Sequence, residues 1–139
     1  MDSSDEDRGA GSPVEIAGGI VERVSLICLA LPEATVRVDA SLVKERSTAH
    51  SFEIRRRSFC LLVAVGRANG EAMPLVVVRA DPDERDALMS IGYPYFAPRA
   101  GRGRIGVWLT SRTDWEEIRE LVTESYCRLA PKKLSALVG

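Results

Sequence analysis

Residues 93–109, YPYFAPRAGRGRIGVWL, form the stretch around which the rest of the chain is organised. Two tyrosines, a phenylalanine and two prolines come first, followed by a turn rich in arginine and glycine and then a short apolar strand. The stretch lies between a helix predicted to end near Ser90 and a long helix predicted to begin near Asp114. It contains no acidic residue and three arginines, Arg99, Arg102 and Arg104. This is the most distinctive local chemistry of the chain, and it includes no catalytic constellation.

Length and composition predict one ordinary globular domain. A chain of 139 residues is long enough to bury a core, and 45% hydrophobic with 28% charged residues is typical of a soluble protein. No apolar run approaches the length of a membrane span, and the first residues are acidic, unlike those of a signal peptide. We therefore expect a cytoplasmic protein with no membrane partner.

Charge is distributed unevenly along the chain. Residues 1–12 hold four acidic side chains and one arginine, a net charge of −3, so the total of −1 leaves +2 for residues 13–139. We interpret residues 1–12 as a disordered acidic leader and residues 13–139 as a single domain. Because the domain is close to neutral, a nucleic-acid interface would have to depend on local clusters of basic residues.

The cysteines and the single histidine predict no metal site. Cys28, Cys60 and Cys127 are far apart and each falls within an apolar pattern, so we expect small buried thiols in a reducing compartment. His50 lies in a polar stretch and is predicted to be a surface residue. Without a Cys-x-x-Cys motif the chain lacks a zinc ligand set, and we expect neither a metal nor a cofactor.

Hydrophobic periodicity predicts helices and strands in a definite order. Ser12 and Pro13 begin a helix that Pro32 ends, and residues 34–39 fit either an edge strand or a loop. The pattern then predicts three antiparallel strands with an Asn-Gly turn at residues 69–70. A short helix from Asp81-Pro82 to Gly92 follows, and after it come a strand at 105–109 and a helix at 115–129. The fold class is therefore α+β: an antiparallel sheet of about four to six strands with helices on one face, in the order α-βββ-α-β(β)-α.

A series of short motifs in this order resembles the MmcQ/YjbR family of small bacterial proteins. The motifs are Leu31-Pro32-Glu33, the strand Ser58–Val65, Asp81-Pro82, Tyr95-Phe96-Ala97-Pro98, Arg102-Gly103-Arg104-Ile105-Gly106-Val107, the helix Trp115–Leu129 and Ala130-Pro131-Lys132-Lys133-Leu134. The resemblance extends from about residue 14 to the end of the chain. It implies a CyaY-like α+β fold and the DNA binding with which the family is labelled. Arg104 stands where many members have a tryptophan, and Arg56-Arg57 replaces the usual Gly-Lys turn.

Two groups of basic residues and one group of aromatic residues are the candidate site residues. Arginine forks suit phosphate oxygens, so two arginine-bearing turns and a lysine pair are predicted to contact nucleic acid. These residues are Arg55, Arg56, Arg57, Arg99, Arg102, Arg104, Lys132 and Lys133. Tyr93, Tyr95 and Phe96 are candidates for stacking on bases or for lining a ligand pocket. The alternative is that the arginines are solvated or paired with local acids and that the aromatic rings, Phe96 in particular, belong to the core.

Nothing in the sequence predicts an enzyme. Glu116-Glu117 and Asp83-Glu84 lie in the first turns of helices, where acidic residues favour the helix dipole. Gly101-x-Gly103-x-x-Gly106 precedes a strand instead of opening a helix, so it is not a dinucleotide motif. Our first hypothesis is a non-enzymatic module that binds DNA weakly. The second is an accessory or self-resistance protein that binds a small ligand or a partner protein through an aromatic pocket near residues 93–98. In either case we expect a monomer or a weak homodimer.

Overall fold

The computed structural model describes residues 16, 18–39, 48–66, 72–99 and 101–138. Three features predicted from the sequence lie outside these residues: the leader at 1–12, the helix start at Ser12 and the Asn-Gly turn at 69–70.

A six-stranded antiparallel sheet is the centre of the fold. Its order is β1-β2-β3-β4-β6-β5. The strands are β1 (Thr35–Asp39), β2 (Ala49–Ile54), β3 (Arg57–Gly66), β4 (Ala72–Arg79), β5 (Tyr95–Phe96) and β6 (Arg104–Trp108). The predicted α+β class is confirmed, and the weakly alternating stretch at 34–39 is an edge strand and not a loop.

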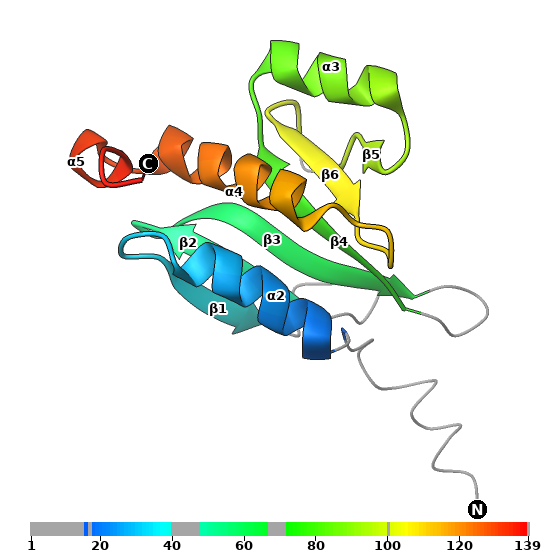
Figure 1. Ribbon diagram of the computed structural model, residues 1–139, viewed down its shortest axis with the longest axis horizontal. Helices are drawn as coiled ribbons and strands as arrows, with labels where there is room; N and C mark the ends of the chain where they lie inside the picture. The colour runs from blue at the N-terminus through cyan, green and yellow to red at the C-terminus, as the bar shows by residue number, and fades with distance from the viewer. Residues whose placement is uncertain (1–15, 17, 40–47, 67–71, 100, 139) are drawn as a thin grey trace, which may run out of the picture.

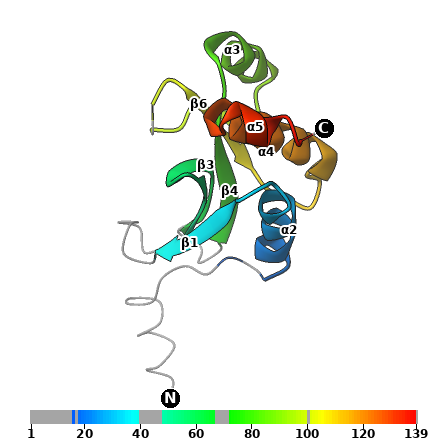
Figure 2. The same ribbon diagram turned by 90° about the vertical axis from the view of Figure 1, so that its left-hand side faces the viewer.

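The helices lie over one face of this sheet and at one of its edges (Figure 1). They are α2 (Gly18–Leu29), α3 (Pro82–Ile91), α4 (Trp115–Leu129) and α5 (Lys132–Ser135). Figures 1 and 2 show α2 and α4 on the same face, with α4 contacting β3 and β4, while α3 lies beside the edge formed by β5 and β6. The other face carries no helix of the described chain and is here named the open face.

Capping residues fix where two of these helices begin. Asp81 precedes Pro82 and accepts a hydrogen bond from the backbone N–H of Glu84 at 2.8 Å, which satisfies one of the free donors of the first turn. Asp114 does the same at the start of α4, where its Oδ1 accepts from the N–H groups of Glu116 and Glu117. Both starts were predicted from the sequence and both are confirmed.

The core lies between the helices and the sheet. Tyr126 is completely buried, its ring meets that of Phe59 edge-to-face at 5.4 Å, and its hydroxyl donates to the carbonyl of Pro32 at 2.6 Å. Cys28 and Cys60 are buried as predicted, and burial raises the pKa of the Cys28 thiol. The prediction was wrong for Cys127, which is exposed because its neighbour Tyr126 takes the inward side of α4.

Ser125 ties α4 to two strands at an irregular point of the sheet. The register between β2 and β3 shifts after Phe52, which marks a β-bulge. At this point the Ser125 hydroxyl donates to the carbonyl of Phe59 at 2.5 Å and accepts from the backbone N–H of Arg79 at 2.9 Å. Because Ser125 is fully buried, it fixes the end of β4 relative to the start of β3.

Candidate functional site

Three strands place an arginine at the same end of the sheet. Antiparallel pairing sets the start of β3 beside the end of β4, and Arg79, at the end of β4, lies directly opposite Arg104, at the start of β6. Arg57 begins β3 on the other side of β4. We name Arg57, Arg79 and Arg104 the arginine row.

Arg79 is the central and least accessible part of the row. Its Nε donates to the carbonyl of Ser58 at 3.1 Å, so its guanidinium bridges β4 to β3. Burial first, and then the positive charges of Arg104 and Arg57, lower the pKa of Arg79. Arg57 and Arg104 therefore each lie close enough to Arg79 to repel its charge.

A fourth guanidinium supports Arg104 from α3. The Nε of Arg85 donates to the backbone carbonyl of Arg104 at 2.9 Å. The backbone N–H of Ala80 donates to the carbonyl of Gly103 at 2.9 Å, which continues the ladder beyond the last paired residues of β4 and β6. Both contacts hold the start of β6 through its main chain, so the Arg104 side chain remains available to a ligand.

The β2–β3 turn brings the predicted arginine cluster to this same end. Arg55 and Arg56 form a two-residue turn with φ of 51° and 67°, the left-handed values that tight hairpins need. Arg55 pairs with Glu33 at 3.2 Å, so its charge is partly neutralised. Arg56 and Arg57 are exposed, and within the described part of the chain neither forms an ion pair.

The loop between β5 and β6 supplies the remaining predicted arginines. Arg99 and Arg102 are exposed in residues 97–103, directly before Arg104, and the described residues offer neither of them an acidic partner. The structure thus brings both predicted arginine clusters to one end of the sheet, which the sequence left open.

The lysine pair does not extend this surface. Lys132 and Lys133 are exposed in α5, after the C-terminus of α4. Figure 1 shows α5 beyond the C-terminal end of α4, apart from the loop between β5 and β6, and Figure 2 shows it on the helix-covered side of the sheet. The predicted lysine contact is therefore separate from the arginine row.

The predicted aromatic group splits between the two faces of the sheet. Phe96 pairs with Gly106 on β6, and its ring fills the space where a side chain of residue 106 would lie. The same ring stacks on Trp108, with centroids 4.9 Å apart and planes inclined by 27°. Phe96 therefore packs against its own sheet, whereas Tyr93 and Tyr95 line a pocket.

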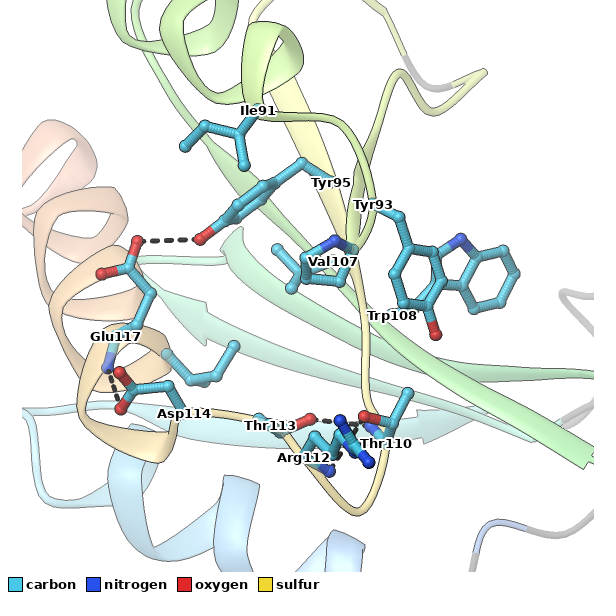
Figure 3. Close-up of a pocket in the computed structure, with 12 residues that line it drawn as sticks. Ile91, Tyr93, Tyr95, Val107, Trp108, Thr110, Arg112, Thr113, Asp114 and Glu117 are labelled. Atoms are coloured by element: carbon cyan, nitrogen blue, oxygen red, sulfur yellow. Dashed lines mark hydrogen bonds between the residues drawn. The ribbon is translucent and has the colours of Figure 1, made fainter.

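That pocket lies between β5, the end of β6 and the N-terminus of α4, and its volume is about 450 Å³ (Figure 3). Its apolar walls are formed by Ile91, Tyr93, Pro94, Val107, Trp108 and Ile118. Its polar lining consists of Tyr95, Thr110, Arg112, Thr113, Asp114 and Glu117. A volume of this size is within the range of small-molecule sites in proteins.

One hydrogen bond orders the polar side of the pocket. The Tyr95 hydroxyl donates to Oε2 of Glu117 at 3.0 Å, as Figure 3 shows. Burial, together with the hydrogen bond to Glu117 and its negative charge, raises the pKa of Tyr95 to about 12. Tyr95 therefore keeps its proton at neutral pH and remains the donor in this pair.

Two other titratable groups have unusual surroundings. Glu84 lies beside Glu124, and burial followed by the hydrogen bond and the charge of Glu124 raises the pKa of Glu84 to about 7. His50, predicted to lie at the surface in a polar stretch, is half-buried in strand β2, and its buried Nδ1 has no hydrogen-bond partner among the described residues. Burial lowers the pKa of His50 accordingly.

Two further features are absent from the described residues. Nowhere among them do three His, Cys, Asp or Glu side chains gather in a way that could hold a metal ion. No helix in the described part of the chain is both long and apolar enough to cross a membrane.

Among the site residues that the sequence did not reveal, Arg79, Arg85 and Glu117 matter most. Arg79 follows an apolar run at the end of a strand, and pairing that strand end with Arg104 would have found it. Glu117 lies in the acidic first turn of α4, which the sequence analysis explained by the helix dipole. Arg85 lies near the start of α3, and no motif marks it. Their contacts come from elements distant in sequence, so no local signal marks them.

Fold and site together define a small α+β domain with an arginine-rich sheet end and a separate pocket. The YjbR family model matches residues 29–128, and the chain belongs to this family, in agreement with the resemblance noted in its sequence. Among solved structures it is similar to the Deinococcus radiodurans protein DR2400, whose domain is described as DUF419. That similarity has 16% identity, covers 81% of this chain and 80% of the other, and has a TM-score of 0.49. No curated protein matches the sequence.

Proposed function

We propose that this protein is a non-enzymatic module that binds nucleic acid through phosphate contacts to the arginine row. The observation that carries the proposal is the placement of Arg57, Arg79 and Arg104 on adjacent strands, close enough for Arg57 and Arg104 to lower the pKa of Arg79. A bound polyanion relieves this repulsion, whereas solvent relieves it only in part. Phosphate oxygens suit guanidinium groups because each can accept paired hydrogen bonds.

The neighbouring turns extend the contact surface. Arg56, Arg99 and Arg102 are exposed at the same end of the sheet. Backbone phosphates recur along a strand, so separated arginines can each contact one, and such contacts carry no sequence information. We therefore expect weak binding with little sequence preference and a strong dependence on salt.

Fluorescence anisotropy tests this function. A labelled duplex and a labelled single strand are titrated with the protein over a series of salt concentrations, and log K is plotted against log salt. Phosphate contacts by the three arginines of the row alone predict a slope of about −2.7 for the duplex, and contacts by the neighbouring turns would make it steeper. In the double variant Arg57→Gln/Arg104→Gln we expect weaker binding and a slope smaller by about one for each arginine removed.

A second double variant serves as the matched control. Lys132→Gln/Lys133→Gln removes the same charge from α5, on the other side of the sheet, and is expected to leave the slope close to that of the wild type. Absence of binding at low salt would contradict the proposed function. An equal loss in both double variants would mean that net charge, and not the arginine row, governs binding.

A further inference from the structure

The pocket at the other end of β6 has a chemistry different from that of the arginine row. Its aromatic and aliphatic walls surround a carboxylate, that of Glu117, which α4 presents from its first turn. We propose that this pocket binds a small organic cation, an ammonium group attached to a flat apolar body.

Glu117 is fixed in place before any ligand arrives. One of its oxygens, Oε2, accepts the proton of the Tyr95 hydroxyl, and Tyr95 is itself held by the pairing of β5 with β6. The described residues provide no hydrogen-bond partner for the other carboxylate oxygen, Oε1. An ammonium group supplies the donors that this oxygen lacks, and charge-assisted hydrogen bonds of this kind are among the strongest in proteins.

The aromatic walls favour the same class of ligand. Tyr93 is 68% exposed at the rim, and Trp108, whose ring also stacks on Phe96, lines the same pocket. The faces of tyrosine and tryptophan rings carry negative potential, so they attract cations as well as flat apolar groups. The pocket thus offers an anionic group at one end and π surfaces at the other.

The remaining charges in the pocket leave it negative. Asp114 lines it as well, although its Oδ1 is occupied by the capping bonds to α4. Arg112 is exposed, and its backbone N–H donates to Oγ1 of Thr110 at 3.0 Å, which orders the loop before α4. Two carboxylates against one guanidinium and the partial positive charge of the α4 N-terminus leave a small negative balance, which favours a cation over an anion of the same shape.

Titration with three probes of matched shape tests the inference. 2-Phenylethylamine, 2-phenylethanol and 3-phenylpropionate carry a positive, a neutral and a negative group on the same ring. The full-length protein is followed by two-dimensional amide NMR. We expect the amine to shift the signals of Ile91, Tyr95 and Val107 with a Kd of about 1 mM, the range for a ligand of this size. The alcohol should bind about tenfold more weakly, and the acid more weakly still.

Two variants make the result specific to Glu117. Glu117→Gln keeps an acceptor for Tyr95 but removes the charge, and it should reduce the affinity for the amine to that for the alcohol. Glu120→Gln removes the same charge from an exposed position of α4 outside the pocket and should leave all three affinities unchanged. The inference would be overturned if the amine and the alcohol bound with equal affinity, or if Glu117→Gln left the affinity for the amine unchanged. It would also be overturned if no probe shifted the pocket signals. None of these outcomes bears on nucleic-acid binding at the arginine row.

Discussion

Arg79 lies directly opposite Arg104 in the antiparallel pairing of β4 with β6. Like charges opposite one another in a sheet are destabilising, so other contacts must hold these strands together. The main chain of Arg79 is bound by Ser125 and that of Arg104 by Arg85. The backbone is thus fixed independently of the two guanidinium groups, and the sheet keeps its register while the charges stay close.

Removing one of these charges is expected to stabilise the fold. Arg104→Gln keeps the backbone contact with Arg85 and relieves the repulsion on Arg79, so the free energy of unfolding should rise by about 0.5 kcal/mol at low salt. The gain should shrink as salt screens the charges. Urea unfolding at two salt concentrations measures it. Arg119→Gln is the control, because Arg119 has an acidic neighbour, Glu116, at 3.6 Å and should show no gain.

Loss of the Ser125 hydroxyl is expected to be costly. Ser125→Ala leaves the carbonyl of Phe59 and the N–H of Arg79 without their partner at a fully buried position. We expect the free energy of unfolding to fall by about 2 kcal/mol. Ser90→Ala removes an exposed hydroxyl that bonds only to a helix carbonyl and should change it by less than about 0.5 kcal/mol. If chemical denaturation showed the same free energy of unfolding for Ser125→Ala and the wild type, this role of Ser125 would be contradicted.

Gly106 is required by the ring that lies over it. A methyl group at this position would clash with the Phe96 ring, so Gly106→Ala should lower the free energy of unfolding by about 1–3 kcal/mol. Phe96→Ala makes room for that methyl group. The double variant Gly106→Ala/Phe96→Ala should therefore lose less free energy of unfolding than the two single variants lose together. Simple additivity in thermal unfolding would show that the ring and the glycine are independent.

Glu84 is expected to make stability depend on pH. Its pKa in the folded state is raised from 4.5 to about 7, so folding favours its protonated form. This contribution is fully present below pH 4.5 and is lost as the pH rises through 7. As the pH rises from 5 to 8, the wild type should therefore lose stability that the variant Glu84→Gln keeps. Because Glu84 is partly solvent-exposed, we expect a difference of about 1 kcal/mol. Parallel denaturation curves at the two pH values measure it, and Glu120→Gln is the charge-matched control.

The fold could be predicted from the sequence to a large extent because its signals are local. The long helix at 115–129 has a capping aspartate, an apolar stripe and a proline beyond its end, and it appears with those bounds. Strand β5 has only two residues, too few for any period, and it exists because β6 pairs with it. The order of the elements was therefore easier to predict than the smallest of them.

The candidate site could be predicted only in part. The sequence identified the arginines of both turns but not Arg79, because which strand ends meet depends on a register between residues far apart in the chain. It grouped Phe96 with Tyr93 and Tyr95, although alternate residues of a strand face opposite sides and Phe96 takes the open face. The role of Glu117 in the pocket could not be predicted, because the helix dipole already explained the acidic first turn of α4.

Strand β6 carries Arg104 at its first residue and Trp108 at its last, so a single rigid segment joins the two proposed sites. Four steps along a strand span about 13 Å. The screening length is about 30 Å at 0.01 M salt and about 8 Å at 0.15 M. In dilute salt the field of a cation in the pocket would reach the arginine row, so we expect each proposed ligand to strengthen the binding of the other by the same factor. At physiological ionic strength the two ends of β6 are electrostatically independent.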